Sequence, residues 1–402
     1  MPGPPGAASP RAGRRGVQRL LPTPEAAELI GLARELAAAE LAPKADEYEA
    51  QARFPREVFR TLGDAGLLGL VYPEEFGGGA QPYEVYLQVL EELATAWLSV
   101  AIGVSVHTLA CHPVAAFGSQ EQRERFLPDM LGGGLLGAYC LSEPQSGSDA
   151  AALTTRAVLE DDPAGEGGGT WVVDGRKAWI THGGEADFYA LMVRTGEPGP
   201  RGISCLLADA GTPGLSAAAP EHKMGANAST TAQIVLDGAR VPADRLVGLP
   251  GQGFEIALAA LDSGRLGIAA CSVGLAQAAL DAAVDWARER RQFGRPVGEF
   301  QGMSFLLADM ATAVAAARAL YLHAARLRDA GRAFGTAAAM AKLFASDTAM
   351  RVTIDAVQVF GGYGYVQDYP VERYLREAKV LQIVEGTNQI QRVVIGRALT
   401  SA

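Results

Sequence analysis

The spacing of apolar residues changes twice along this 402-residue chain, and this change constrains its fold more than any other feature. Across residues 23–137, apolar positions recur every three or four residues, as in the runs at 83–96 and 120–131. This spacing gives a helix one apolar face that can pack on a core. Residues 23–137 are therefore predicted to form an N-terminal α-helical domain.

Residues 138–248 instead carry short β-like runs separated by turn residues. The runs at 171–173 and 178–180 flank Asp174-Gly175, and an Asp-Gly dipeptide supplies the positive φ angles of a type I′ turn. We therefore expect a β-hairpin here, within a middle antiparallel β domain. Further strands are expected at 188–194, 203–208 and 231–236, with Asp237-Gly238 as another turn.

Residues 249–402 return to helical periodicity, in longer runs. Between Met303 and Ala324 the apolar positions step by four and three, the spacing of a bundle helix that packs along one seam. Similar runs occupy 253–291, 336–358 and 388–399. The prediction is a C-terminal four-helix bundle, and the chain as a whole belongs to the α+β class.

Residues 1–22 have a different composition, with four arginines, several prolines and no acidic residue. A mitochondrial presequence is also rich in arginine and free of acids, but proline and glycine at this density break the amphipathic helix that it needs. We therefore expect a disordered tail. The high arginine and alanine content suggests a GC-rich bacterial genome, which favours a cytoplasmic location over the mitochondrial matrix.

Composition argues against several classes of protein. The net charge of -10 disfavours a nucleic-acid binder, because a phosphate backbone requires a concentrated basic face. No uninterrupted apolar run approaches the roughly 20 residues of a membrane span, so none is expected. The histidines and cysteines lack metal-ligand spacing, so no metal site is predicted, and a disulfide framework is not indicated. The cysteines are Cys111, Cys140, Cys205 and Cys271.

A GxGxxG match at Gly132–Gly137 is misleading. A dinucleotide-binding fingerprint requires a strand before it and a helix after it. The preceding residues 120–131 have the pattern of a charged amphipathic helix. We expect a loop that joins the first two domains.

Four clusters near the predicted domain joints combine residues suited to ligand binding. Tyr139–Asp149 is rich in hydroxyls, and Trp179–Thr181 sets a flat aromatic ring beside a hydroxyl. Asp262–Arg265 and Arg288–Gly294 place arginines where they could meet an anion such as pyrophosphate. Ile383–Ile390 sets a carboxylate before a helix N-cap, Thr387 or Asn388. Taken alone, three of these clusters are more often a polar loop, a core tryptophan and a solvated loop glutamate, and the arginine cluster is as often a solvated helix end.

Together these clusters resemble the acyl-CoA dehydrogenase family over about residues 23–400. The resemblance looks closest to the short-chain, butyryl-CoA dehydrogenase branch. It is carried by the strings YCLSEPQSGSDAAALTTRA, WVVDGRKAWIT, LDSGRLGIAACSVGLAQAALD, RERRQFGRPVGEFQ, AVQVFGGYGY and IVEGTNQIQRVVIGR, in the family's order and spacing.

The resemblance implies an FAD cofactor, whose flavin ring would lie against Tyr139–Ser142 and Trp179–Thr181. Ser142 and Thr181 would hydrogen-bond its edge. Phe300 stands where some relatives have a polar residue. The implied cofactor residues are Tyr139, Cys140, Leu141, Ser142, Gly147, Ser148, Trp179, Ile180, Thr181, Arg290, Gln292, Phe293, Gln301, Gln358, Val359, Gly361, Gly362, Thr387, Asn388 and Gln389.

The resemblance also implies that Glu385 removes the α proton of an acyl-CoA while flavin N5 accepts the β hydride, which yields a trans-2-enoyl-CoA. Apolar neighbours, Ile383 and Val384, are expected to raise the pKa of this carboxyl. Some relatives carry the base at the position of Gly264, which cannot act as one. The implied substrate residues are Ser148, Asp262, Ser263, Gly264, Arg265 and Gly386.

The family also suggests partners. An electron-transferring flavoprotein is expected to accept the electrons, and a homotetramer, or at least a dimer, is expected because the cofactor site spans subunits. The residues matched approximately to the pocket base, Ala101, Ile102 and Ser105, include no arginine for a distal carboxylate, which disfavours a dicarboxylyl-CoA substrate. The LDSGR string looks closest to the short-chain branch, which favours a short- or medium-chain acyl group. Two alternatives stay open: a tailoring dehydrogenase or oxidase acting on a carrier-protein thioester, and a non-catalytic scaffold with this fold.

Overall fold

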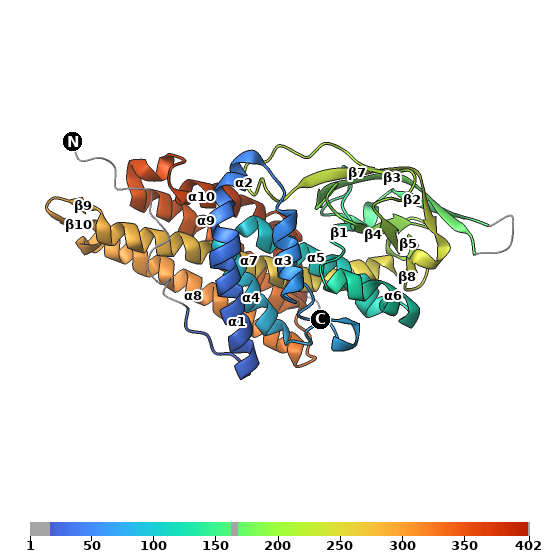
Figure 1. Ribbon diagram of the computed structural model, residues 1–402, viewed down its shortest axis with the longest axis horizontal. Coiled ribbons are helices and arrows are strands. Elements are labelled where there is room, and N and C mark those ends of the chain that lie inside the picture. The colour runs from blue at the N-terminus through green and yellow to red at the C-terminus, as the bar shows by residue number, and fades with distance from the viewer. Residues whose placement is uncertain (1–16, 162–167, 401–402) are drawn as a thin grey trace.

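A computed structural model describes residues 17–161 and 168–400 (Figure 1). A helical N-terminal domain comes first, and its helices at 83–96 and 120–131 are confirmed as α4 and α6. A π-helical turn joins α1 to α2, and Ser119 caps α6 through a reciprocal capping box with Gln122. The helices are α1 (Pro24–Leu36), α2 (Ala42–Gln51), α3 (Arg56–Asp64), α4 (Tyr83–Ala96), α5 (Leu98–Phe117) and α6 (Gln120–Leu131).

The glycine-rich segment after α6 is a loop, as expected. No strand precedes it, because α6 ends at Leu131 and β1 begins at Gly137. Gly133 has a φ of 79°, and a Cβ on Gly63 would lie 2.6 Å from the Gly133 Cα. The two backbones thus touch, which explains the glycines without a phosphate ligand.

The middle domain is a mainly antiparallel sheet at one end of the molecule (Figure 1). Its strand order is β6-β7-β3-β2-β4-β5-β8, and β1 pairs with β4 in parallel. The strands expected at 188–194, 203–208 and 231–236 are confirmed. The strands are β1 (Gly137–Cys140), β2 (Arg156–Glu160), β3 (Thr170–Thr181), β4 (Phe188–Arg194), β5 (Ile203–Asp209), β6 (Leu215–Ala217), β7 (Thr231–Pro242) and β8 (Leu246–Val247).

The expected hairpin at Asp174-Gly175 is wrong, and so is the turn at Asp237-Gly238. Both dipeptides lie inside long paired strands, β3 and β7, whose register shifts between Val173 and Gly175. The Gly238 N–H donates to the Asp174 carboxylate at 2.8 Å, and Gly238 has a φ of 60°. The positive φ that Asp-Gly tolerates therefore serves a bulge between two strands and not a chain reversal.

The C-terminal domain is a helical bundle in which α7 lies against α8 and α9 (Figure 1). A short hairpin, β9 (Arg291–Gln292) and β10 (Arg295–Pro296), joins α7 to α8 at the end of the molecule far from the sheet. α10 and α11 pack on α9. The helices are α7 (Gly253–Glu289), α8 (Gln301–Asp329), α9 (Gly335–Phe360), α10 (Pro370–Leu381) and α11 (Asn388–Thr400).

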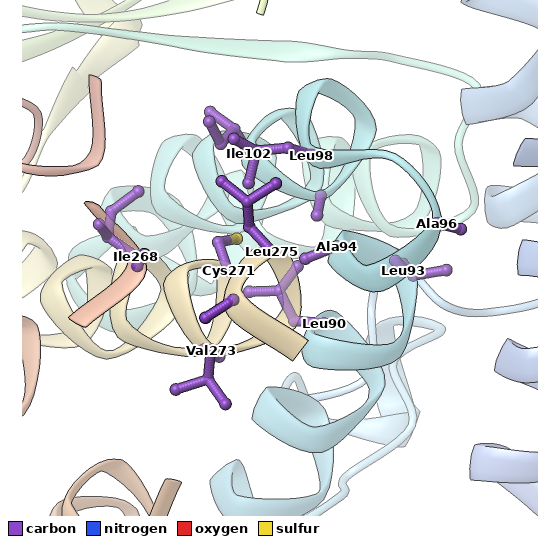
Figure 2. Close-up of a cluster of buried hydrophobic side chains, with 14 of the residues drawn as sticks. Leu90, Leu93, Ala94, Ala96, Leu98, Ile102, Ile268, Cys271, Val273 and Leu275 are labelled. Carbon is purple, nitrogen blue, oxygen red and sulfur yellow. The ribbon is translucent and has the colours of Figure 1, made fainter. Parts of the chain in front are cut away.

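The main core joins the two helical domains along α7. Figure 2 shows Leu90 of α4 and Ile102 of α5 facing Ile268, Cys271 and Leu275 of α7, all of them buried. Contact on both sides explains why α7 has no polar face over this stretch. α7 extends from the sheet at one end to the β9–β10 hairpin at the other, so it connects the two ends of the molecule.

The expectation that no segment is apolar enough for a membrane span needs correction. By length and composition three helices reach that level, α5, α7 and α8. In α5 and α7, 78% and 72% of the apolar window is buried inside the protein, which accounts for their composition. In α8 only 28% of the window is buried, so this helix presents an apolar face outward.

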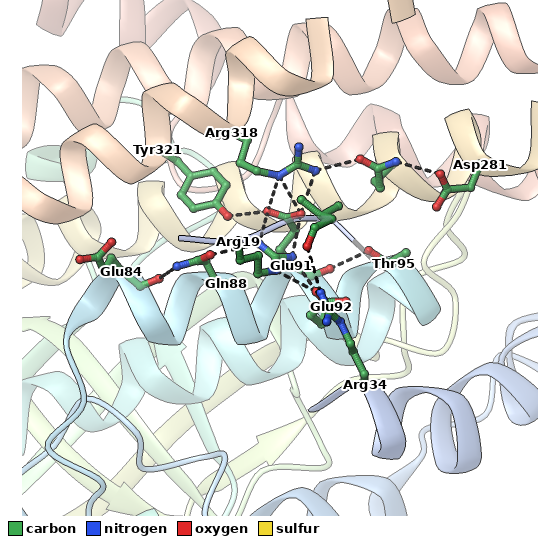
Figure 3. Close-up of polar contacts among 12 residues, drawn as sticks. Arg19, Arg34, Glu84, Gln88, Glu91, Glu92, Thr95, Asp281, Arg318 and Tyr321 are labelled. Carbon is green, nitrogen blue, oxygen red and sulfur yellow. Dashed lines mark hydrogen bonds and ion pairs between the residues drawn. The ribbon is translucent and has the colours of Figure 1, made fainter. Parts of the chain in front are cut away.

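Part of the predicted disordered tail is packed against the helices. Residues 1–16 lie outside the described residues, but Arg19 donates to Glu91 at 3.0 Å and to Glu92 at 2.9 Å (Figure 3). The Arg19 side chain is only 3% exposed. Buried carboxylates on α4 require cations, and Arg19 supplies one. The packed chain therefore begins before Thr23.

Candidate active site

Glu385 lies in the short loop between α10 and α11, in a backbone conformation that is unusual for glutamate. Its φ is 54°, and Gly386 follows with a φ of 87°. The Gln391 side-chain amide donates to the Glu385 and Gly386 carbonyls at 3.2 and 2.8 Å. The Lys342 ammonium donates to the same Gly386 carbonyl at 2.9 Å. These contacts hold two consecutive left-handed residues in place.

Lys342 connects this loop to α9. It is fully buried and also donates to the Asn388 side-chain oxygen at 2.8 Å. The Asn388 amide in turn donates to Ser346 and Asp347, at 2.9 and 2.7 Å. At the start of α11, the Thr387 hydroxyl accepts a hydrogen bond from the Ile390 N–H. Both ends of the Asn388 amide are thus committed within the protein, which leaves its side chain less available to a cofactor.

The Glu385 carboxylate points at α7. A Cβ on Gly264 would lie 2.8 Å from Glu385 Oε2, so only glycine leaves room there. Oε2 is buried and has no hydrogen-bond partner among the described residues. Burial raises the pKa of Glu385 to about 7, although the charges of Lys342 and Arg265 act to lower it. A buried, unpartnered carboxylate with such a pKa is suited to proton transfer.

The expected direction of this pKa shift is correct, and burial is its main cause. Of the two apolar neighbours named, Val384 is partly buried against the main core, whereas Ile383 is 52% exposed and contributes little to that burial.

The predicted substrate residues on α7 lie together beside Glu385. Arg265 is buried and donates to Asp262 at 2.6 Å, while its Nε has no partner in the described chain. Burial raises the pKa of Asp262, and Arg265 acts against this shift. The Ser263 carbonyl accepts from the Tyr83 hydroxyl at 3.0 Å. The predicted Ser148 is exposed in the loop after β1.

A cavity of about 210 Å³ reaches this group at Gly264. Of the three residues matched to the pocket base, Ser105 lines the cavity, whereas Ala101 and Ile102 are buried elsewhere in the core. The aromatic and basic side chains of this cavity were not predicted from the sequence. Its walls comprise Val71, Tyr72, Pro73, Tyr83, Ser105, Thr108, Leu109, His112, Ala115, Ala116, Ala260, Ser263, Gly264 and Arg328.

Trp179 is not a core residue, since 65% of its surface is exposed. It has a φ of 62° and lies where the register of β3 with β7 shifts, between Lys177 and Ile180. Bulges of this kind commonly re-aim a side chain next to a site. Backbone strain at an exposed aromatic ring, with half-buried Thr181 next to it, fits a flat ring ligand such as a flavin.

The segment from Tyr139 to Ser142 lies beside this tryptophan. The Ala178 N–H donates to the Ser142 carbonyl at 2.9 Å, which joins the two predicted flavin segments. Tyr139, Cys140 and Leu141 are buried, whereas Ser142 is partly exposed. Of these residues, Ser142 is therefore the one with a side chain open to a ligand.

An ion pair that sequence reasoning missed fixes this segment. Lys177 and Glu143 are buried and lie 2.7 Å apart, and Lys177 also donates to the Leu141 carbonyl. Burial would raise the pKa of Glu143, but Lys177 and the Thr154 and Thr155 donors outweigh it and lower the pKa to about 2. A lysine between apolar positions of β3 was the available sequence signal.

Another group of the predicted cofactor residues lies at the end of α7 far from the sheet, near the β9–β10 hairpin (Figure 1). Phe293 is 95% exposed there with a φ of 50°, and Arg290 lies over the Tyr363 ring. One chain thus separates the predicted cofactor residues into two distant groups. Those at the hairpin end are Arg290, Gln292, Phe293, Gln301, Gln358, Val359, Gly361 and Gly362, and Val359 is the buried one.

Comparison with known proteins agrees with this architecture. Three domain models of one family match: "Acyl-CoA dehydrogenase, N-terminal domain" at residues 23–134, "middle domain" at 138–239 and "C-terminal domain" at 251–400. An acyl-CoA dehydrogenase of Bacillus subtilis is 43% identical, over 94% of this chain and 98% of the relative. The mitochondrial isobutyryl-CoA dehydrogenase of Dictyostelium discoideum is 40% identical, over 94% and 90%.

A solved structure also matches. Butyryl-CoA dehydrogenase from Megasphaera elsdenii superimposes with a TM-score of 0.91 at 40% identity, covering 95% of this chain and 100% of that chain. The three domain models together span most of the sequence, in the order that the fold shows. The chain therefore belongs to the acyl-CoA dehydrogenase family.

Proposed function

We propose that this acyl-CoA dehydrogenase converts a short- or medium-chain acyl-CoA to the trans-2-enoyl-CoA, with Glu385 as the base that removes the α proton. The observation that carries the proposal is Glu385 Oε2, which is buried, unpartnered and directed at Gly264 on the cavity wall. A general base needs this reach and a pKa near the working pH. Bound acyl thioester would supply the missing partner.

The residues present fit FAD. Exposed Trp179, with Ser142 and Thr181 beside it, would hold the flavin ring. When bound, FAD supplies the acceptor for the β hydride. The protein's own part is to hold the ring on one side of the acyl chain and Glu385 on the other.

Removal of the α proton builds negative charge on the thioester oxygen, and the loop offers donors for it. The backbone N–H groups of Glu385 and Gly386 make no hydrogen bond within the described chain. Free N–H groups adjacent to the base can stabilise an enolate-like oxygen. Arg265, whose Nε also lacks a partner, adds positive charge to the same region.

The first test is a panel of saturated acyl-CoAs from C4 to C16, with an artificial electron acceptor and chromatographic identification of the product. We expect the highest kcat/KM at the short end and a trans-2-enoyl-CoA product. Turnover only of an acyl group on a carrier protein would replace this proposal with the tailoring-enzyme alternative. A purified protein without bound flavin and without activity would favour the scaffold alternative.

Electron-transferring flavoprotein is the proposed electron acceptor, because the family pairs with it. Reduced enzyme should transfer electrons to purified electron-transferring flavoprotein much faster than to oxygen. Peroxide formed in stoichiometric amounts at the turnover rate would instead favour an oxidase.

We also propose that a second copy of the chain completes the cofactor site. The two groups of cofactor residues lie at opposite ends of α7, and α8 presents apolar side chains outward, Phe305 being 60% exposed. A dimer or tetramer would cover this face and bring Arg290 and Gln358 of one copy to the flavin residues of another. Light scattering that finds an active, FAD-saturated monomer would contradict this proposal.

A further inference from the structure

The cavity beside Glu385 carries one fixed charge. Arg328, in the last turn of α8, is the only lysine or arginine among the residues that line it, and no carboxylate lines it. The uncharged remainder of the wall is largely aromatic and aliphatic. A cavity that is apolar and positively charged at one place favours a ligand with an anionic group.

The Arg328 guanidinium is oriented by an aromatic ring and makes one long ion pair. It lies 3.8 Å from the centre of the Tyr83 ring, which orients it. The nearest carboxylate, on Asp329, is 4.0 Å away and accepts hydrogen bonds from the Tyr83 and Glu84 N–H groups at the start of α4. Within the described chain the guanidinium donates no hydrogen bond, and the 4.0 Å contact with Asp329 is too long to be one, so its forked donors can still hydrogen-bond an anion.

Most other polar groups that line the cavity already make hydrogen bonds within the protein. The Tyr72 hydroxyl donates to the Thr108 carbonyl, and the Tyr83 hydroxyl donates to the Ser263 carbonyl. His112 is an exception, because its buried Nε2 has no partner in the described chain. Burial, together with the charge of Arg328, lowers the pKa of His112 to about 4, so at neutral pH it offers a hydrogen bond without charge.

We propose that Arg328, with His112, forms an anion-binding subsite for the substrate, which takes either a distal carboxylate on the acyl group or a phosphate of CoA. The inference rests on the proposed function, since the cavity belongs to the substrate only if Glu385 acts there. A guanidinium with free, forked donors matches an oxyanion of either source. No arginine lies near Ser105 in the sequence, whereas the fold brings Arg328 of α8 to the same cavity as Ser105.

The test compares wild type with Arg328→Gln on butyryl-CoA, glutaryl-CoA and butyryl-pantetheine, by kcat/KM or by the inhibition constant where turnover is absent. If the subsite holds a carboxylate, the variant loses at least about tenfold more on glutaryl-CoA than on butyryl-CoA. If it holds a phosphate, both CoA esters lose at least about tenfold more than butyryl-pantetheine. Either pattern supports the subsite. Equal losses on all three thioesters, or no loss on any, would overturn it.

Two further variants sharpen the test. Arg328→Lys keeps the charge but not the fork, so it should recover part of the lost discrimination. Arg326→Gln is the matched control, because Arg326 lies in the same helical turn, pairs with Glu84 at 2.8 Å and does not line the cavity. Its ratios among the three thioesters should equal those of wild type. A wild-type enzyme that turns over none of the thioesters contradicts the proposed dehydrogenase activity, whereas the subsite is tested by these ratios.

Discussion

Glu91 and Glu385 are both buried carboxylates, yet their surroundings are opposite. Glu91, on α4, accepts hydrogen bonds from Arg19 at 3.0 Å and from Arg318 at 2.9 and 3.0 Å, and also from the Tyr321 hydroxyl (Figure 3). Burial acts to raise the pKa of Glu91, but the two arginines outweigh it and lower that pKa. Glu91 therefore stays ionised and joins the N-terminal segment, α4 and α8.

Glu385 has the same burial without the partners. Its Oε2 accepts no hydrogen bond within the described chain, and burial raises its pKa to about 7. An unmade hydrogen bond costs stability, and a substrate can recover that energy on binding. Burial alone therefore does not distinguish a structural carboxylate from a reactive one. The two differ in the number of hydrogen-bond donors that contact the carboxylate within the protein.

The largest effect is expected from Glu385→Gln, which keeps the size of the side chain and removes its basicity. A positioned general base contributes about 10² to 10⁴ in rate, so kcat should fall by at least about 10²-fold. FAD content and acyl-CoA binding should be retained. Stopped-flow bleaching of the flavin by substrate measures the step directly.

A position swap sharpens this result. A Cβ at Gly264 would begin 2.8 Å from Glu385 Oε2, so Glu385→Gly combined with Gly264→Glu places a carboxylate close to the original one. Part of the lost rate should return in the double variant. If Glu385→Gln bleaches the flavin at nearly the wild-type rate, the base is assigned wrongly, and Asp262 is the next carboxylate to examine.

The next largest effect should come from Glu91→Gln, which tests the other half of the comparison. The change leaves the buried charges of Arg19 and Arg318 short of a counter-ion, and breaking such a network costs about 3 to 5 kcal/mol. Denaturant unfolding should show this loss, while kcat per folded molecule changes little. Glu160→Gln is the control, because the Glu160–Arg240 pair is about half exposed and should contribute less than about 1 kcal/mol. Equal stability of the two variants would mean that the Glu91 network is not structural.

Elements with a local determinant are the ones that the sequence predicts best. The helices at 83–96 and 120–131 follow from apolar spacing within the segment itself, and α4 and α6 have those bounds. The prediction failed at Asp174-Gly175, because a turn dipeptide and a bulge dipeptide share the same backbone angles, and only the pairing of β3 with β7 separates them. Local sequence patterns therefore predict individual helices and strands better than they predict which strands pair.

The site shows the same limit. Glu385 was identified through resemblance, but Arg19 and Arg328 act through contacts with residues far along the chain, which no local pattern reveals. Lys342 did leave a signal. It stands four residues after Ala338 and three before Ala345, within the buried seam of α9, where a lysine requires a partner.

A smaller effect is expected from Lys342→Met. This change removes a cation beside Glu385, so that its surroundings differ further from those of Glu91, which has two arginine partners. Lys342 and Arg265 are the cations that face Glu385, and Tyr83 and Tyr139 are the other ionisable groups near it. Loss of the Lys342 charge should raise the pKa of Glu385, and with it the lower limb of the pH profile of kcat/KM, by about 1 unit. Lys342→Arg should keep the limb in place. A fall in rate at all pH values without a shift would indicate that Lys342 only supports the loop.

The smallest effect concerns stability, and its sign is opposite to that of Glu91→Gln. The pKa of Glu385 is raised from 4.5 to about 7 in the folded protein, so the folded state binds this proton more tightly than the unfolded state. Stability from that protonation is present below pH 4.5 and is lost as the pH rises through 7.

Glu385→Gln cannot ionise, so above pH 7 it should unfold at a temperature roughly 1 to 4 °C higher than wild type. The difference should shrink toward zero near pH 4.5, as followed by calorimetry of both FAD-loaded proteins across this range. A variant that is less stable than wild type at pH 8 would show that ionised Glu385 is as well satisfied as Glu91, and the comparison would fail.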